Sequence, residues 1–297
     1  MVEVVGLGQS CIDHLSLVQA FPAEDSKQEF DRLLVQGGGP AATALVCLAR
    51  LGRRTAFVGR VGDDDFGRFI QEGLMAEGVD TAFLGVSPGA GSQYAFILAN
   101  SDQGTRTVFW TRSTAGEVRP DEVPAGLIRQ ARVLHLDGLM ASASLAAARL
   151  AREAGTAVVL DGGTLRPHSR ELAGMVDHLV VSETFAQAYT PGLSPAEAAR
   201  RLTDLGPRTV VITSGAGGSV GYDGGEIITL PAWEVEVVDT TGAGDAYHGG
   251  YIDGLLEGLD LEGRMRFAAV VAALNCTALG GRTALPDRDR VEALLRG

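Results

Sequence analysis

Apolar runs rich in valine, isoleucine and leucine alternate along this chain with helix-like runs that end at glycine. The strand-like runs include VEVVGLG, RVLHLDG, TAVVLDGG, DHLVVSE and RTVVITSG, and the helix-like runs include PAATALVCLARLG and SLAAARLAREAG. Near-continuous apolar strands separated by helices are typical of a parallel sheet covered on both faces. The pattern predicts one α/β domain over residues 1–297, with a doubly wound, mostly parallel sheet and helices on both faces.

Two segments interrupt the alternation. Residues 14–35 and 91–112 alternate apolar and polar residues, and ILANSDQGTRTVFW has the form of a β-hairpin with its turn around Ser101–Gly104. Short strands inserted into an α/β core would form a small β-sheet at its edge. We expect this sheet to act as a lid over a site at the carboxyl ends of the main strands.

The composition limits the classes of partner. The 297 residues carry a formal net charge of -12, which argues against nucleic acid or an anionic membrane as the main partner. No apolar run approaches the roughly 18 residues that a membrane span needs. The start MVEVVGLGQS has no basic signal-peptide region, and the three cysteines are widely spaced. We expect a cytoplasmic protein.

The segment VVDTTGAGDAYHGGY, residues 237–251, is the most informative about chemistry. Gly242, Ala243 and Gly244 would let backbone N–H groups point into one concavity at a helix amino terminus, where the helix dipole favours an anion. A carboxylate beside a bound anion is electrostatically unfavourable. Asp245 is therefore better explained as a general base than as a stabilising group, with helix capping as the alternative.

A second glycine-rich segment, VQGGGPAATALVCLARLG, places three glycines directly before a helix with Pro40 in its first turn. Glycines at such a position allow the backbone to approach a ligand closely. One glycine-rich loop is a weak indication of function, but the pair of loops in one α/β chain indicates a site that handles phosphoryl groups.

With both segments, the chain resembles the ribokinase or PfkB-type carbohydrate kinases over essentially its whole length. The resemblance rests on GGGPAATALVCLARLG, VGRVGDDDFG, VVITSGAGG, DTTGAGDAYHGG and CTALGGRTALP. It implies a kinase that transfers the γ-phosphoryl group of ATP to a hydroxyl of a small, ketohexose-like sugar, with Mg²⁺ and K⁺ as cofactors and a lid-mediated homodimer. GGGPAATA resembles a branch that contains sulfofructose kinases, with ketohexose kinases as more distant relatives.

The resemblance also implies roles for individual positions. They are catalysis by Asp245 with N–H groups of Gly242, Ala243 and Gly244; sugar binding by Asp13, Gly38 and Gly39; nucleotide binding by Thr213, Gly215, Gly218, Asn275 and Ser182; and a monovalent-cation site at Asp239 and Thr241.

The chain departs from the family in the middle of the sequence. Where the family has Asn-x-x-Glu, VVSETF places Ser182 and Phe185, so Glu183 becomes the candidate Mg²⁺ ligand. The sugar-binding Asn of the family's glycine motif corresponds to Ala42. We therefore expect the lid to supply sugar contacts.

Three cations of the lid segments are candidates for an anionic group on the substrate. They are Lys27, which is the only lysine of the chain, Arg106 and Arg112. Exposed arginines on hairpins are usually solvated, so a purely solvent-facing role is the alternative for the two arginines.

Three other functions are alternatives to that of a sugar kinase. A nucleoside kinase of the same fold should have more aromatic residues than the 6% found here. VVGLGQSC begins like a dinucleotide-binding fingerprint, but Cys11 stands where a third glycine is needed. A sugar- or nucleotide-sensing module without catalysis would be expected to lose Asp245, which is present.

Overall fold

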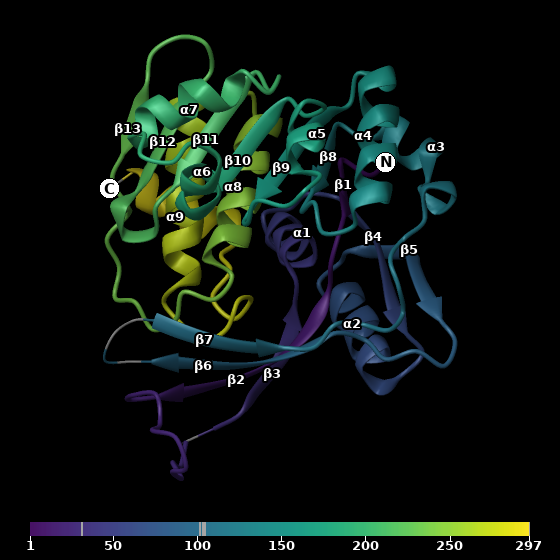
Figure 1. The fold of residues 1–297 in the computed structure, drawn as a ribbon, viewed down its shortest axis with the longest axis vertical. Helices are drawn as coiled ribbons and strands as arrows, with labels where there is room; N and C mark the ends of the chain where they lie inside the picture. The colour runs from purple at the N-terminus through teal and green to yellow at the C-terminus, as the bar shows by residue number, and fades with distance from the viewer. Residues whose placement is uncertain (31, 101, 103–104, 297) are drawn as a thin grey trace.

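Nine of the described strands form the main sheet, in the order β13-β12-β11-β10-β9-β8-β1-β4-β5 (Figure 1). The computed structural model describes residues 1–30, 32–100, 102 and 105–296. The strands are β1 (Val4–Leu7), β4 (Thr55–Gly62), β5 (Asp80–Ser87), β8 (Val133–Leu136), β9 (Ala157–Gly162), β10 (His178–Ser182), β11 (Thr209–Thr213), β12 (Ser219–Tyr222) and β13 (Ile228–Leu230).

All neighbouring pairs in this sheet are parallel from β5 to β11, and only β12 and β13 add antiparallel pairs among the described strands. None of the described helices is long and apolar enough to cross a membrane. The predicted doubly wound, mostly parallel sheet is confirmed.

Successive residues of the central strands point to opposite faces of the sheet, and both faces are apolar. Val4 and Val180 pack into one core, and their neighbours Val5 and Leu179 pack into the other. The first core is covered by α1 (Pro40–Arg50), α2 (Asp65–Ala76), α8 (Ala243–Leu256), α9 (Leu261–Asn275) and α10 (Arg288–Arg296). The second is covered by α3 (Ala125–Gln130), α4 (Ala141–Ala154), α5 (Ser169–Ala173), α6 (Glu183–Tyr189) and α7 (Pro195–Thr203).

A second, four-stranded sheet lies along one side of the main body (Figure 1). Its order is β3-β2-β6-β7, and it consists of β2 (Cys11–Val18), β3 (Leu34–Gly38), β6 (Tyr94–Asn100) and β7 (Thr105–Trp110). The central pair β2–β6 is parallel and the outer pairs are antiparallel. We call this sheet the lid sheet.

The lid sheet differs in detail from the prediction. The strand β2 begins at Cys11 and β3 continues to Gly38, so the glycine-rich segment is an extension of a lid strand. The strands β6 and β7 pair as the predicted hairpin. Except for Asp102, its turn at Ser101–Gly104 lies outside the described residues.

The close packing of α8 against α9 requires the absence of a side chain at Gly250, and a substitution there tests this requirement. A Cβ at Gly250 would lie 2.8 Å from Cα of Ala268 and 3.1 Å from Cβ of Val271, whereas a Cβ at Gly73 of α2 would meet nothing within 4 Å. We expect Gly250→Ala to lower the free energy of unfolding by about 1–3 kcal/mol through overpacking. We expect Gly73→Ala to raise it by about 0.5–1 kcal/mol. Urea unfolding measures both, and changes of the same sign would contradict this account.

Candidate active site

The amino terminus of α8 presents backbone donors without acceptors. Gly242 precedes the helix with φ 73°, a left-handed conformation that favours glycine. The N–H of Ala243 donates to the Thr240 carbonyl (3.2 Å), whereas the N–H groups of Gly242, Gly244 and Asp245 have no acceptor among the described residues. Two of the three predicted donors are therefore free, Ala243 is engaged, and Asp245 adds one. Free N–H groups at a helix start favour an anion.

The side chains of Asp239 and Asn275 stabilise this turn through hydrogen bonds. The carboxylate of Asp239 accepts hydrogen bonds from Thr241 N (2.9 Å), Thr241 Oγ1 (2.8 Å) and Gly280 N (2.8 Å). Asn275, a predicted nucleotide-binding residue, is fully buried, and its Nδ2 donates to the Thr241 carbonyl (3.0 Å). The Thr241 carbonyl thus has a partner, whereas the Asp245 N–H, in the first turn of α8, has none among the described residues.

Asp245 is a half-buried carboxyl in the first turn of α8. Burial raises its pKa to about 7, the neighbouring Asp161 raises it as well, and His248 and Arg106 act in the opposite direction. The ring of His248 lies 3.7 Å from Asp161, Nδ1 to Oδ2, and its Nδ1 is 2.7 Å from the Gly244 carbonyl. A carboxyl that titrates near neutral pH suits a general base.

Asp13 and the glycines predicted to bind sugar lie together. Asp13 is buried on β2, its Oδ1 accepts the Cys11 thiol (3.2 Å), and burial raises its pKa. A Cβ at Gly38 would lie 2.0 Å from Asp13 Oδ2. Gly39 directly precedes α1 with φ 94°, and a Cβ there would lie 2.4 Å from the Gln9 carbonyl oxygen. Only glycine allows the turn to approach Asp13 so closely.

Asp137 is a site residue that sequence reasoning missed. It follows β8, its Oδ2 accepts Gln9 N (2.6 Å), its Oδ1 accepts Leu139 N (2.9 Å), and burial raises its pKa to about 6. A Cβ at Gly8 would lie 2.1 Å from its carboxylate, which explains this glycine without a dinucleotide. Asp161 was missed too. Both follow an apolar run and precede Gly, in HLDG and VVLDGG, and that shared pattern could have found them.

Arg282 is the third residue that sequence reasoning missed. Its side chain is buried, Nη2 donates to the Gly38 carbonyl (3.0 Å) and Nε to Thr43 Oγ1 (3.2 Å). Burial lowers its pKa, while the carboxylates of Asp13 and Asp245 act in the opposite direction. It places a buried cation beneath the glycine turn, close to both carboxylates. Nothing in GGRTALP distinguishes this arginine from an exposed one.

The three lid cations have different surroundings. Arg106 Nη1 donates to Thr240 Oγ1 (3.0 Å), which brings β7 to the turn before α8. The guanidinium of Arg112 lies over the Trp110 ring, 5.5 Å from its centroid. Lys27 is exposed and forms no hydrogen bond or ion pair with any described residue. The structure thus brings Arg106 to the site, but not Arg112 or Lys27.

The remaining predicted residues follow β10 and β11 at their carboxyl ends. The Ser182 hydroxyl caps α6 by accepting Phe185 N (3.1 Å), and Glu183 is exposed without a hydrogen-bonding partner among the described residues. Thr213 ends β11, and it is followed by Gly215 (φ 55°) and Gly218 (φ 84°). A Cβ at Gly215 would meet nothing within 4 Å, whereas a Cβ at Gly218 would lie 2.1 Å from the Leu230 carbonyl oxygen, so only Gly215 leaves open space at this sheet edge.

Transfer of a phosphoryl group to a hydroxyl needs positioning, donors for negative charge and one base, and this sheet edge offers all three. The architecture and the site define a ribokinase-like phosphotransferase. Residues 1–288 match the pfkB family carbohydrate kinases, and the chain belongs to this family. Members of the family are ATP-dependent phosphotransferases with hydroxyl acceptors.

Individual similar proteins are consistent with this family assignment. The chain is 32% identical to 5-dehydro-2-deoxygluconokinase from Shouchella clausii, over 99% of this chain and 95% of that protein. It is 30% identical to a nucleoside kinase from Methanothermobacter thermautotrophicus, over 96% and 93%. The structure of Arabidopsis thaliana ribokinase complexed with ribose and ATP superposes with a TM-score of 0.88, 26% identity and 100% coverage of both chains. The protein is a sugar or nucleoside kinase of the pfkB family.

The raised pKa of Asp245 predicts a pH-dependent effect on stability. The carboxyl ionises near 3.8 when unfolded and near 7 when folded, so its destabilising contribution is absent below the first value and complete above the second. We expect Asp245→Asn to raise the free energy of unfolding by on the order of 2 kcal/mol at pH 8.5 and by almost nothing at pH 4. Urea unfolding at both pH values measures the difference, and a pH-independent effect would contradict it.

Proposed function

We propose that the protein transfers the γ-phosphoryl group of ATP to a hydroxyl of a small, ketohexose-like carbohydrate, with Asp245 as general base. The supporting observation is a carboxyl with a pKa of about 7 beside N–H groups of Gly242, Gly244 and Asp245 that have no acceptor among the described residues. Asp245 takes the hydroxyl proton as the oxygen attacks, and the N–H groups stabilise charge on the transferred group.

The acceptor sugar is held between the glycine turn and the lid. Asp13, buried against Gly38, accepts hydrogen bonds from sugar hydroxyls, and Gly39 lets the chain turn at this point. Arg106, at Thr240, is the lid cation best placed for an anionic group on the substrate. No contact supports the same role for Lys27 or Arg112.

The residues present are compatible with both proposed metal ions. Glu183 has a free, exposed carboxylate that would hold hydrated Mg²⁺, which supplies charge neutralisation on the phosphates. Near Asp239 and Thr241, the Oδ1 atom of Asn275 is a buried acceptor with no partner among the described residues, which supports a K⁺ site beside the turn. Thr213, Gly215, Gly218 and Ser182 would lie along the nucleotide.

A substrate panel with one catalytic variant tests this proposal. ADP release from MgATP is measured with ketohexoses, aldopentoses, sugar acids, sulfofructose and nucleosides, in KCl and in NaCl. With the preferred sugar, we expect Asp245→Asn to lower kcat about 10²–10⁴-fold because the proton has no acceptor. We expect wild-type kcat to rise as pH passes about 7, since the base must be ionised.

Lys27→Ala serves as a control for a lid residue without contacts, and it should retain wild-type kcat and KM. Wild-type activity in Asp245→Asn would contradict the base assignment. A protein that releases no ADP with any acceptor would be better explained as a sensor of sugars or nucleotides.

A nucleoside kinase is the second candidate, and the lid carries one observation in its favour. Trp110 stands opposite the buried Ala95 in the β6–β7 pair, so it lies on the inner face of the lid with Arg106, and it is 55% exposed. An indole ring facing the acceptor side can stack on a nucleobase. ADP release with nucleosides and not with sugars would select this function.

We also propose that two copies of the chain associate through the outer face of the lid sheet. Phe96 and Phe109 face each other in the β6–β7 register, on the opposite face from Trp110, and they are 51% and 55% exposed. Phe21, 49% exposed, stacks on Phe109 with ring centroids 6.4 Å apart. Exposed aromatic side chains gathered on one surface favour a protein interface.

Light scattering after size exclusion tests this association. We expect a dimer for the wild type and a monomer for Phe109→Asp, because the interface would have to bury an unpaired charge. Phe69→Asp, at a 41% exposed phenylalanine of α2, is the matched control and should remain dimeric. A wild-type monomer, or equal behaviour of the two variants, would contradict the proposal.

A further inference from the structure

A cavity of about 520 Å³ opens at the amino ends of β9, β10 and β11. Its walls also include the carboxyl end of α8 and part of α9. The candidate active site lies at the other ends of the same strands. A strand rises about 3.3 Å per residue, so the five residues of β10 separate the two places by roughly 13 Å. The cavity is therefore a separate place on the protein.

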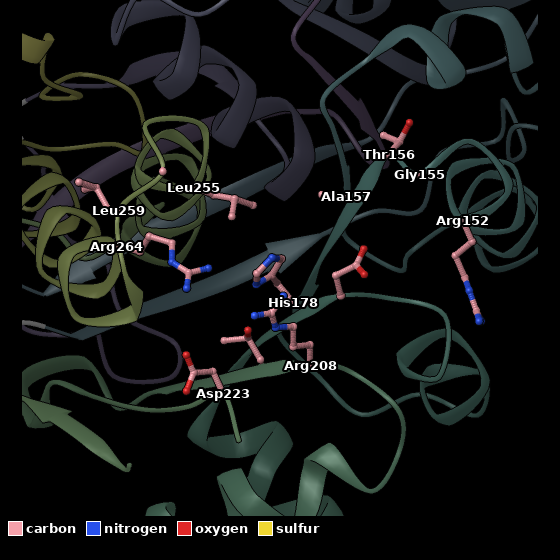
Figure 2. Close-up of a pocket in the computed structure, with 13 residues that line it drawn as sticks. Arg152, Gly155, Thr156, Ala157, His178, Arg208, Asp223, Leu255, Leu259 and Arg264 are labelled. Carbon is pink, nitrogen blue, oxygen red and sulfur yellow. The ribbon is translucent and has the colours of Figure 1, made fainter. Parts of the chain in front are cut away.

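Three basic side chains meet in this cavity. Figure 2 shows Arg264, Arg208 and His178 pointing toward one another, with Asp223 beside them and Arg152 at the far side. Arg264 and His178 are each 8% exposed. In a chain with a net charge of -12, neither Arg264 nor Arg208 forms an ion pair with any described residue. Cations so close together favour an anion between them.

The hydrogen-bond partners of His178 indicate which of its ring nitrogens carries the proton. Arg264 Nη1 donates to Tyr251 Oη (3.3 Å), and Tyr251 Oη lies 3.1 Å from His178 Nδ1. The tyrosine proton finds an acceptor when it points at Nδ1, which leaves the histidine proton on Nε2. This Nε2–H has no acceptor among the described residues. Burial and the two arginine charges lower the pKa of His178 to about 3, so the ring stays neutral at pH 7.

Donors without acceptors are thus aimed into the cavity from three side chains. In Arg264, Nε donates to the Asp260 carbonyl (3.1 Å) and Nη1 donates to Tyr251 Oη. The Nη2 atom has no partner among the described residues. Arg208 has no hydrogen bond to a described residue. Guanidinium groups match the tetrahedral oxygens of phosphate with paired hydrogen bonds.

The wall also has acceptors, and Asp223 lies beside the basic side chains. The side chain of Asp223 accepts no hydrogen bond from a described residue. In Asp177, Oδ2 accepts a hydrogen bond from Val158 N (2.8 Å). Carboxylates would repel a ligand that is anionic along its whole length, but they accept hydrogen bonds from hydroxyl groups. The cavity is therefore complementary to a molecule that carries both an oxyanion and hydroxyl groups.

We propose that this cavity is a second ligand site, which binds a small phosphorylated polyhydroxy compound. Its phosphate oxygens accept hydrogen bonds from Arg264, Arg208 and His178, and its hydroxyl groups donate to Asp223 and Asp177. The site requires no part of the catalytic machinery.

Calorimetric titration of the whole protein with glycerol 3-phosphate, inorganic phosphate and glycerol tests the site. Arg208→Glu is the pocket variant, because this side chain is exposed and has no hydrogen bond or ion pair with a described residue. Arg266→Glu is its matched control: Arg266 is exposed, has no partner among the described residues and carries the same charge change. We expect glycerol 3-phosphate to bind about tenfold more weakly to Arg208→Glu and unchanged to Arg266→Glu.

Binding at the candidate active site would be equal in both variants, so it cannot produce this difference. Equal affinity of the two variants, or no binding of glycerol 3-phosphate to the wild type, would overturn the proposal. Equal affinities of the wild type for inorganic phosphate and glycerol 3-phosphate would overturn the assignment of a hydroxyl-bearing ligand. Weak or absent binding of glycerol beside firm binding of glycerol 3-phosphate is the expected result.

Discussion

The carboxylate of Asp239 holds the candidate active site in place. It accepts three hydrogen bonds from two segments far apart in sequence, the loop before α8 and the loop after α9. Bonds of N–H and O–H groups to an ionised carboxylate are among the stronger ones in proteins. They keep Gly242 in its left-handed conformation and the start of α8 open. A Cβ at Gly242 would lie only 2.7 Å from Cα of Gly281, so the two loops meet backbone to backbone.

The loop after α9 also reaches the lid. The Arg282 N–H donates to Gln36 Oε1 (2.8 Å), and Gln36 Nε2 donates to Thr283 Oγ1 (3.3 Å). Since Gln36 belongs to β3, one short segment contacts a lid strand, the glycine turn and the turn at the start of α8. The lid sheet and the turn at the start of α8 are therefore connected twice, by this loop and by the hydrogen bond from Arg106 to Thr240.

Much of this arrangement could be predicted from the sequence, for identifiable reasons. Parallel strands that are buried on both faces are near-continuous apolar runs. The alternation of strands and helices can therefore be predicted from the sequence alone. The turn at Gly242–Asp245 could be predicted because consecutive small residues directly before a helix are typical of an anion-binding site. What the sequence could not show depends on tertiary contacts: the burial of Arg282, the bond between Asn275 and the Thr241 carbonyl, and the engagement of the Ala243 N–H.

Strand register accounts for another part of the difference. Neighbouring residues of a strand point to opposite faces, so Phe109 and Trp110, adjacent in sequence, belong to the outer and inner faces of the lid. The sequence pattern predicts that both residues belong to the lid, but it does not show which face of the lid each one occupies. The pairing with β6 decides it, because Trp110 stands opposite a buried alanine and Phe109 opposite an exposed phenylalanine.

The scarcity of lysine has a practical consequence. Lys27 is the only lysine of the chain, and it is exposed on the loop that joins β2 to β3. Apart from the terminal amine, amine-reactive reagents therefore have a single target, and that target is attached to the lid sheet. A fluorophore coupled there would report on the lid alone, without any engineered cysteine. The three native cysteines are buried and would not compete for the label.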